Sequence, residues 1–117
     1  MADDASLICN SSDLEDGGRG VRFQWTSQSG VLWPAFALRY QGVVVAYINR
    51  CAHVSVELDW IDGEFFDRDK RYLVCSTHGA LYRPEDGFCI EGPCQGKQLE
   101  SITVTEAAGQ VLMVKEI

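Results

Sequence analysis

The stretch from Val43 to His53 reads Val-Val-Val-Ala-Tyr-Ile-Asn-Arg-Cys-Ala-His and sets the interpretation of the whole chain. Its apolar first half is rich in β-branched side chains, which is typical of a buried β-strand. Cys51 and His53 follow where that strand is expected to end. A thiol and an imidazole in a loop at a strand end are candidate metal ligands.

A second pair repeats this arrangement about twenty residues later. Cys75 and His78 follow the apolar run Tyr72-Leu73-Val74, and the chain contains only these two histidines. Taken singly, each of the four residues is an ordinary buried thiol or a hydrogen-bonded histidine. Because loops at strand ends converge readily, the two pairs together predict one metal centre.

Two kinds of centre accept two cysteines and two histidines. A zinc ion does so, but zinc modules usually present two cysteines in one knuckle or a cysteine pair followed by a histidine pair. A [2Fe-2S] cluster explains the mixed pairs better, because each loop then gives its cysteine to one iron and its histidine to the other. We favour the iron–sulfur cluster and keep a structural or regulatory zinc module as the alternative.

The two pairs, followed by Asp86-Gly87 and Gly92-Pro93, resemble the Rieske ferredoxin family over roughly residues 36–117. The resemblance implies an all-β, small antiparallel fold with a cluster-binding loop subdomain. It also implies that a [2Fe-2S] cluster is held through Cys51 and Cys75 on the inner iron and through His53 and His78 on the outer iron. Gly92-Pro93-Cys94 would be the third loop, which covers the cluster.

The chain lacks the extra cysteines that form a disulfide between the ligand loops of high-potential members, so it resembles the soluble, disulfide-free branch. Those members also carry a serine and a tyrosine that hydrogen-bond sulfur, where this chain has Ala80 and Tyr82. With one donor of two, we expect a reduction potential in the lower half of the range of about −150 to +300 mV. The alternative for Tyr82 is a packed aromatic whose hydroxyl reaches water.

The family resemblance implies a one-electron carrier that passes electrons from a reductase to an oxygenase or similar acceptor. The small subunit of a multi-subunit oxidoreductase is an alternative. Both histidines are used as ligands and no Gly-rich dinucleotide fingerprint follows a strand, so we expect no catalytic residue and no substrate chemistry.

The formal charge of 10 − 17 = −7 argues against nucleic acid as a partner. An acidic start and the lack of a long apolar run argue against a membrane and for a cytoplasmic protein.

We expect one domain over residues 1–117, built mainly of strands. The predicted strands are Val21–Thr26, Phe36–Tyr40, Val43–Asn49, Arg71–Cys75, Ser101–Thr105 and Val111–Lys115. Gln41-Gly42 and Ala107-Ala108-Gly109 are predicted turns, Ser11–Glu15 a single helical turn, and Met1–Ala5 a fraying end.

Residues 59–70 lengthen the connection between the ligand pairs, and we predict a hairpin from Glu64–Phe66 to Arg71–Val74 with its turn at Asp67–Lys70. Six carboxylates lie between the pairs, at positions 57, 59, 62, 64, 67 and 69. They form either a solvated surface or an acidic rim that steers a basic redox partner.

Three cysteines lie outside the ligand pattern. Cys9, Cys89 and Cys94 are expected to be small buried thiols, and a disulfide between Cys89 and Cys94 is the alternative.

Overall fold

The computed structural model describes residues 5–27, 29–51, 56–59, 61–75, 79–92 and 95–114. These residues form three antiparallel sheets of three strands each, ordered β1-β9-β8, β2-β3-β4 and β5-β6-β7. The strands are β1 (Ala5–Asn10), β2 (Val21–Thr26), β3 (Leu32–Tyr40), β4 (Val43–Ile48), β5 (Leu73–Val74), β6 (Leu81–Tyr82), β7 (Cys89–Glu91), β8 (Val104–Ala107) and β9 (Gln110–Val114). The predicted all-β antiparallel fold is confirmed.

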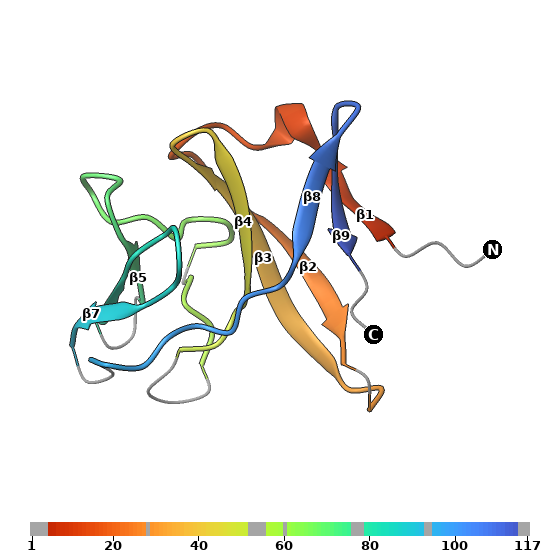
Figure 1. Ribbon diagram of the computed structural model, residues 1–117. Helices are drawn as coiled ribbons and strands as arrows, with labels where there is room; N and C mark the ends of the chain where they lie inside the picture. The colour runs from red at the N-terminus through yellow and green to blue at the C-terminus, as the bar shows by residue number, and fades with distance from the viewer. Residues whose placement is uncertain are drawn as a thin grey trace.

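The β2-β3-β4 sheet lies between the other two sheets (Figure 1). Along β3, the side chains of Phe36 and Leu38 pack toward β5, β6 and β7, whereas Ala35 and Ala37 pack toward β1 and β9. Successive residues of a strand point to opposite faces, so a strand covered on both faces is apolar throughout. This explains why the central strands read as continuous apolar runs.

Two buried cores result from this arrangement. The ligand-side core consists of Phe36, Leu38, Tyr47, Cys51, Leu58, Phe65, Leu73, Cys75, Ala80, Tyr82, Cys89 and Leu99. The sandwich core consists of Cys9, Leu14, Ala35, Ala37, Ala46, Ile48, Ile102 and Val111. The expected metal site therefore belongs to a different core from the one that joins β1 and β9 to the central sheet.

The turn between β3 and β4 matches its prediction. Gln41 and Gly42 both have positive φ angles, of 50° and 82°. Two successive positive φ values are typical of the hairpin turn whose twist matches that of the flanking strands. Asp16 accepts the backbone N–H groups of Gln41 and Gly42 at 2.7 and 3.1 Å, which fixes the turn from outside the hairpin.

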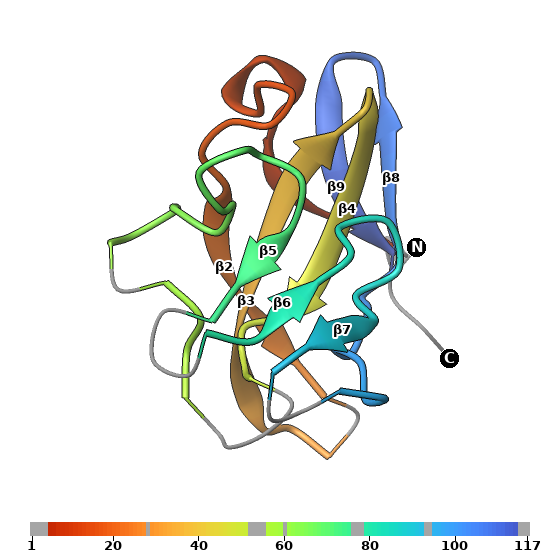
Figure 2. The ribbon, with the colours of Figure 1, turned by 90° about the vertical axis from the view of Figure 1, so that its left-hand side faces the viewer.

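The predicted insert hairpin (residues 64–74) is also present. Phe66 pairs antiparallel with Leu73, and the Asp67 N–H donates to the Tyr72 carbonyl at 2.8 Å. The Asp67 carboxylate accepts the N–H of Arg71 at 3.0 Å and stabilises the polar turn. Figure 2 shows β5, β6 and β7 in front of the long central strands, with the insert hairpin leading into β5.

Several predicted element boundaries are wrong. The strand expected from Ser101 begins only at Val104; Ser101 instead forms an isolated bridge with Tyr47, beside β4. The strands β1, β6 and β7 were not predicted, and β1 begins at Ala5, which was expected to fray. Strands of two or three residues are too short to show an alternating pattern, so neighbouring backbone defines them instead.

The predicted helical turn is a 3₁₀ helix over Ser11–Asp13, with Asn10 rather than a serine before it. Asp13 Oδ2 accepts the Asn10 N–H at 3.0 Å, as an acidic residue does in a capping box. The turn ends where Leu14 takes an extended conformation and enters the sandwich core. Among the described residues, no helix has the length and apolar character needed to cross a bilayer.

Candidate metal centre

The first ligand loop (residues 51–56) begins three residues after β4. Its first residue, Cys51, is 2% exposed. The Cys51 N–H donates to the Val56 carbonyl at 2.8 Å, which closes the loop at its base. A short closed loop of this kind fixes the direction in which the cysteine side chain leaves the backbone.

The second ligand loop (residues 75–80) is closed in the same way. Cys75 directly follows β5 and is fully buried. Its N–H donates to the Ala80 carbonyl at 2.9 Å, and its carbonyl accepts the Gly79 N–H at 2.7 Å. Both cysteines thus stand at the first position of a loop whose ends are hydrogen-bonded together.

Tyr82 connects the two loops. It lies on β6, is fully buried, and places its hydroxyl oxygen 3.3 Å from the sulfur of Cys51. The predicted hydrogen bond between Tyr82 and the sulfur of Cys51 is present, and the alternative that its hydroxyl reaches water is wrong because Tyr82 is fully buried. Ala80, the last residue of the second loop, is also fully buried and offers no side-chain donor.

Both cysteine side chains lie in the ligand-side core, so the structure brings Cys51 and Cys75 to one buried region. Thiolates are costly to bury unless a metal or a hydrogen bond stabilises them. Two buried sulfurs with a buried hydroxyl beside one of them fit the inner, cysteine-bound iron of the expected cluster. His53 and His78, predicted as the outer ligands, lie outside the described residues.

The start of the expected third loop packs directly on the second. A Cβ atom placed on Gly92 would lie 2.8 Å from Ala80 Cα, and the φ angle of Gly92 is +108°. Only glycine permits this close approach and this backbone conformation together. Pro93 and Cys94 lie outside the described residues.

A buried polar pair that no sequence pattern predicts lies behind the first ligand loop. Asn49 and Asp59 are buried, and the Asn49 amide donates to Asp59 Oδ1 at 2.9 Å. The sequence pattern predicts Asn49 as the last residue of a strand and Asp59 as one of six carboxylates between the ligand pairs. Only the folded chain shows that their side chains meet.

Most carboxylates of the predicted acidic rim have nearby basic or backbone partners. Arg22 of β2 contacts Glu57 and Asp62 at 2.8 Å and Asp59 at 3.8 Å. Glu64 is paired with Arg19 at 3.0 Å, and Asp67 accepts backbone N–H groups in the hairpin turn. Two arginines thus contact four of the six carboxylates, so the rim is less acidic than its sequence indicates.

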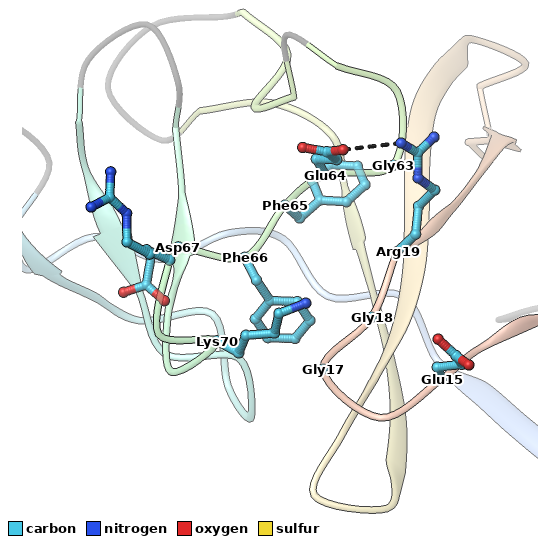
Figure 3. Close-up of a pocket in the computed structure, with 11 residues that line it drawn as sticks. Glu15, Gly17, Gly18, Arg19, Gly63, Glu64, Phe65, Phe66, Asp67 and Lys70 are labelled. Carbon is cyan, nitrogen blue, oxygen red and sulfur yellow. Dashed lines mark hydrogen bonds and ion pairs between the residues drawn. The ribbon is translucent and has the colours of Figure 1, made fainter.

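An open pocket of about 440 Å³ separates residues 15–19 from the insert hairpin (Figure 3). The Arg19–Glu64 ion pair lies at its upper rim, and Lys70 lies beside Phe66 below. Of the predicted ligands that the structure describes, neither Cys51 nor Cys75 lines this pocket. It is a surface hollow of mixed charge, distinct from the buried sulfurs.

Two of the remaining cysteines are buried, as expected. Burial raises the pKa of the Cys9 thiol, and Asp13 raises it further, so this thiol stays protonated at neutral pH. Cys89 lies in the ligand-side core, and its sulfur donates to the Glu91 carbonyl at 3.4 Å. Cys94, its proposed disulfide partner, falls outside the described part of the chain.

Comparisons with known proteins agree on the fold. The family model for the Rieske [2Fe-2S] domain matches residues 4–111. The ferredoxin of carbazole 1,9a-dioxygenase from Nocardioides aromaticivorans IC177 matches 97% of this chain and 100% of its own, with a TM-score of 0.71 and 17% identity. No curated protein sequence matches the chain significantly.

Longer chains share the same fold in one part. The terminal oxygenase of carbazole 1,9a-dioxygenase from Novosphingobium sp. KA1 has a TM-score of 0.74 and 23% identity; 97% of this chain matches 30% of that one. A chain of the reduced complex between oxygenase and ferredoxin in carbazole 1,9a-dioxygenase has a TM-score of 0.70 and 20% identity, over 94% of this chain. The protein spans only 28% of that chain. The family model covers nearly the whole sequence, and the chain therefore belongs to the Rieske [2Fe-2S] domain family.

Proposed function

We propose that this protein is a one-electron carrier whose [2Fe-2S] cluster is held by Cys51, His53, Cys75 and His78. It takes an electron from a reductase and passes it to an oxygenase or a similar acceptor. Family membership implies the cluster, and the assignment of its four ligands rests on the two Cys-His pairs. The cluster supplies reversible one-electron chemistry when bound.

One observation carries the proposal: two loops, each closed at its base, deliver Cys51 and Cys75 into one apolar core beside the hydroxyl of Tyr82. Neither sulfur is accessible to a substrate, because both cysteines are at most 2% exposed. Buried thiols of this kind are suited to holding a metal and not to attacking a substrate. His53 and His78 follow these cysteines by two and three residues in the sequence and complete the proposed ligand set.

The protein's own groups set the electrostatics of this centre. A cysteine bound to metal is a thiolate and has no proton to donate, so Tyr82 is then the donor to Cys51. A donor to a ligand sulfur stabilises the more negative redox state and raises the reduction potential. Ala80 provides no such donor, and the apolar core disfavours additional negative charge. These opposing effects place the expected potential in the lower half of the Rieske range.

The partner is proposed from similarity alone. The ferredoxin from Nocardioides aromaticivorans IC177, which this chain matches end to end, belongs to a carbazole 1,9a-dioxygenase, and a related oxygenase has been crystallised with its ferredoxin. By analogy, this protein delivers electrons to an oxygenase. The same fold also occurs within longer oxygenase chains, which keeps an oxidoreductase subunit as the second candidate.

Metal analysis and single-turnover kinetics test this proposal together. The purified protein should contain two irons and two acid-labile sulfides per chain, and the reduced form should lose one electron to a Rieske oxygenase in a stopped-flow experiment. One zinc per chain without sulfide would instead identify the zinc module. A bound cluster that transfers electrons only within a purified multi-subunit complex would identify the oxidoreductase subunit.

A further inference from the structure

We propose that Asn49 and Asp59 form a buried clamp that positions the first ligand loop, and thereby Cys51 and His53, for cluster binding. This inference rests on the proposed function. It assigns both side chains as positioning residues, since neither is a predicted ligand. The clamp consists of the side chains of Asn49 and Asp59 and the backbone groups that they bind.

The contacts form a continuous chain across the base of the loop. Asn49 Oδ1 accepts the Leu58 N–H at 2.8 Å, and Asn49 Nδ2 donates to Asp59 Oδ1 at 2.9 Å. Asp59 Oδ2 accepts the Gly63 N–H at 3.0 Å. Asn49 lies two residues before Cys51, so the clamp holds the strand side and the return side of the loop together.

Burial makes these contacts strong. Asn49 is 1% exposed and Asp59 6% exposed, and Leu58, whose N–H donates to Asn49, belongs to the ligand-side core. A buried carboxylate or amide that loses its partner cannot recover the hydrogen bond from water, so such pairs tolerate few alternative geometries. The clamp therefore specifies one position for residues 49 and 58 relative to each other.

The clamp lies directly behind the backbone hydrogen bond that closes the loop. Cys51 N–H donates to the Val56 carbonyl, and Asn49 Oδ1 accepts from Leu58, two residues further along the returning segment. The two contacts are neighbouring hydrogen bonds between the same two segments, one accepted by a backbone carbonyl and one by a side chain. The sequence places no extra cysteine in either ligand loop, so these two hydrogen bonds take the place of a cross-link in constraining the first loop.

Arg22 connects the clamp to the central sheet. Its guanidinium lies 3.8 Å from Asp59 Oδ2 and 2.8 Å from the carboxylates of Glu57 and Asp62, on either side of the clamp. Asp59 thus accepts hydrogen bonds from both the Asn49 amide and the Gly63 N–H, and it lies beside a guanidinium that belongs to β2.

The sharpest test exchanges the two side chains. Asn49→Asp places a carboxylate where the amide donated and sets it against Asp59, which breaks the central hydrogen bond by repulsion. Adding Asp59→Asn restores every bond with the donor reversed: the new amide at 59 donates to the carboxylate at 49 and accepts from Gly63, and the carboxylate at 49 still accepts from Leu58. The double variant therefore keeps the geometry while moving the charge.

Two quantities are measured. The first is the rate of cluster loss in the presence of a chelator, detected as bleaching of the visible spectrum, and the second is the EPR linewidth of the reduced protein. We expect Asn49→Asp to lose its cluster about tenfold faster and to show broadened EPR lines, because a broken buried contact of about 1.4 kcal/mol is a tenfold change in rate. The double variant should return to within about twofold of wild type. Measurements are made at a temperature where circular dichroism shows all variants folded.

Asp16→Ala is the matched control. It also removes a carboxylate that accepts two hydrogen bonds, but at the β3–β4 turn, the opposite end of β4 from Cys51. We expect it to lower the melting temperature without changing cluster loss or linewidth.

The outcomes separate the two proposals. A wild-type protein without iron and sulfide overturns the proposed function. If the wild-type protein holds a cluster but Asn49→Asp loses it no faster than Asp16→Ala does, the clamp alone is overturned. The clamp is also overturned if the double variant loses its cluster as fast as Asn49→Asp. If Asn49→Asp does not fold, Asp59→Asn alone serves instead, because its single side-chain oxygen can accept from only one of the two donors, the Asn49 amide and the Gly63 N–H. Cluster loss no faster than in wild type, or a double variant that loses its cluster as fast as Asp59→Asn, again contradicts the clamp.

Discussion

At the scale of single residues, Tyr82 is the clearest determinant of redox behaviour. Its hydroxyl lies 3.3 Å from the sulfur of Cys51 in a fully buried position. We predict that Tyr82→Phe lowers the reduction potential by about 40 mV, because a hydrogen bond that favours one redox state by about 1 kcal/mol shifts a one-electron couple by that amount. Redox titration monitored by circular dichroism measures the shift.

Ala80→Ser is the complementary variant, since it adds a donor at the position that lacks one. Its potential should rise while that of Tyr82→Phe falls. An unchanged potential in Tyr82→Phe, with the cluster content of wild type, would show that the hydroxyl does not bond the ligand sulfur in the loaded protein.

A second residue-scale prediction concerns Arg39 and Glu106, which form two hydrogen bonds at 3.0 and 2.6 Å. The side-chain hydrogen bonds from Arg39 lower the pKa of Glu106 to about 2. A carboxyl whose pKa is lowered on folding stabilises the protein above its unfolded pKa and loses that contribution as pH falls through the folded value.

Glu106→Gln should therefore be less stable than wild type at pH 7, and the difference should shrink progressively between about pH 4.5 and pH 2. Urea unfolding of both proteins at several pH values tests this. A stability difference that is constant down to pH 2 would contradict it.

Residue types with distinctive chemistry were predictable from sequence, and ordinary polar residues were not. Cys51, Cys75 and Tyr82 stand out because their spacing matches a motif that needs them. Asn49 and Asp59 have no such spacing: they are ten residues apart, and their hydrogen bond exists only because the chain turns back behind the first ligand loop. Likewise, no pattern in the sequence indicates that Arg22 contacts three carboxylates.

At the scale of elements, the turn between β6 and β7 has a strict steric requirement. Gly87 has a φ angle of +74°, and a Cβ atom there would lie 2.8 Å from Tyr47 Cε1. Tyr47 cannot easily give way, because its hydroxyl donates to the Pro84 carbonyl at 2.6 Å in the ligand-side core. We predict that Gly87→Ala destabilises the protein by about 2–4 kcal/mol, from backbone strain and overpacking together.

Gly42→Ala is the matched control for that variant. Gly42 has a similar φ of +82° in an open turn with nothing within 4 Å of a Cβ atom. Its substitution should cost only the backbone strain of about 1–2 kcal/mol. Equal losses in the two variants, measured by chemical denaturation, would show that contact with Tyr47 contributes nothing.

Long strands and turns could be predicted because their signals are local. β2 matches its predicted bounds, and the insert hairpin follows from two short runs around a polar turn. β6 and β7 could not be predicted, because strands of two or three residues are too short to show an alternating pattern. Their pairing depends on the chain around the expected metal site. The strand predicted from Ser101 starts too early in the chain, because Ser101 forms an isolated bridge with Tyr47 of β4 and β8 begins only at Val104.

At the scale of the whole molecule, the net charge of −7 predicts how the protein meets a basic redox partner. Raising ionic strength from about 0.01 to 0.15 M shortens the screening length from about 30 to 8 Å. We predict at least about a tenfold slower second-order reduction by a basic reductase at the higher salt, measured by stopped flow. A rate that is independent of salt would contradict electrostatic steering, including any contribution from the partly neutralised rim.

The central claim is that Cys51, His53, Cys75 and His78 hold a [2Fe-2S] cluster between two closed loops. The most direct measurement is the EPR spectrum of the dithionite-reduced protein. Ligation by two histidines predicts a rhombic signal whose average g lies below that of an all-cysteine [2Fe-2S] cluster, and predicts its loss in His53→Ala and His78→Ala. An EPR-silent reduced protein, or a signal with the average g of an all-cysteine cluster, would contradict the account.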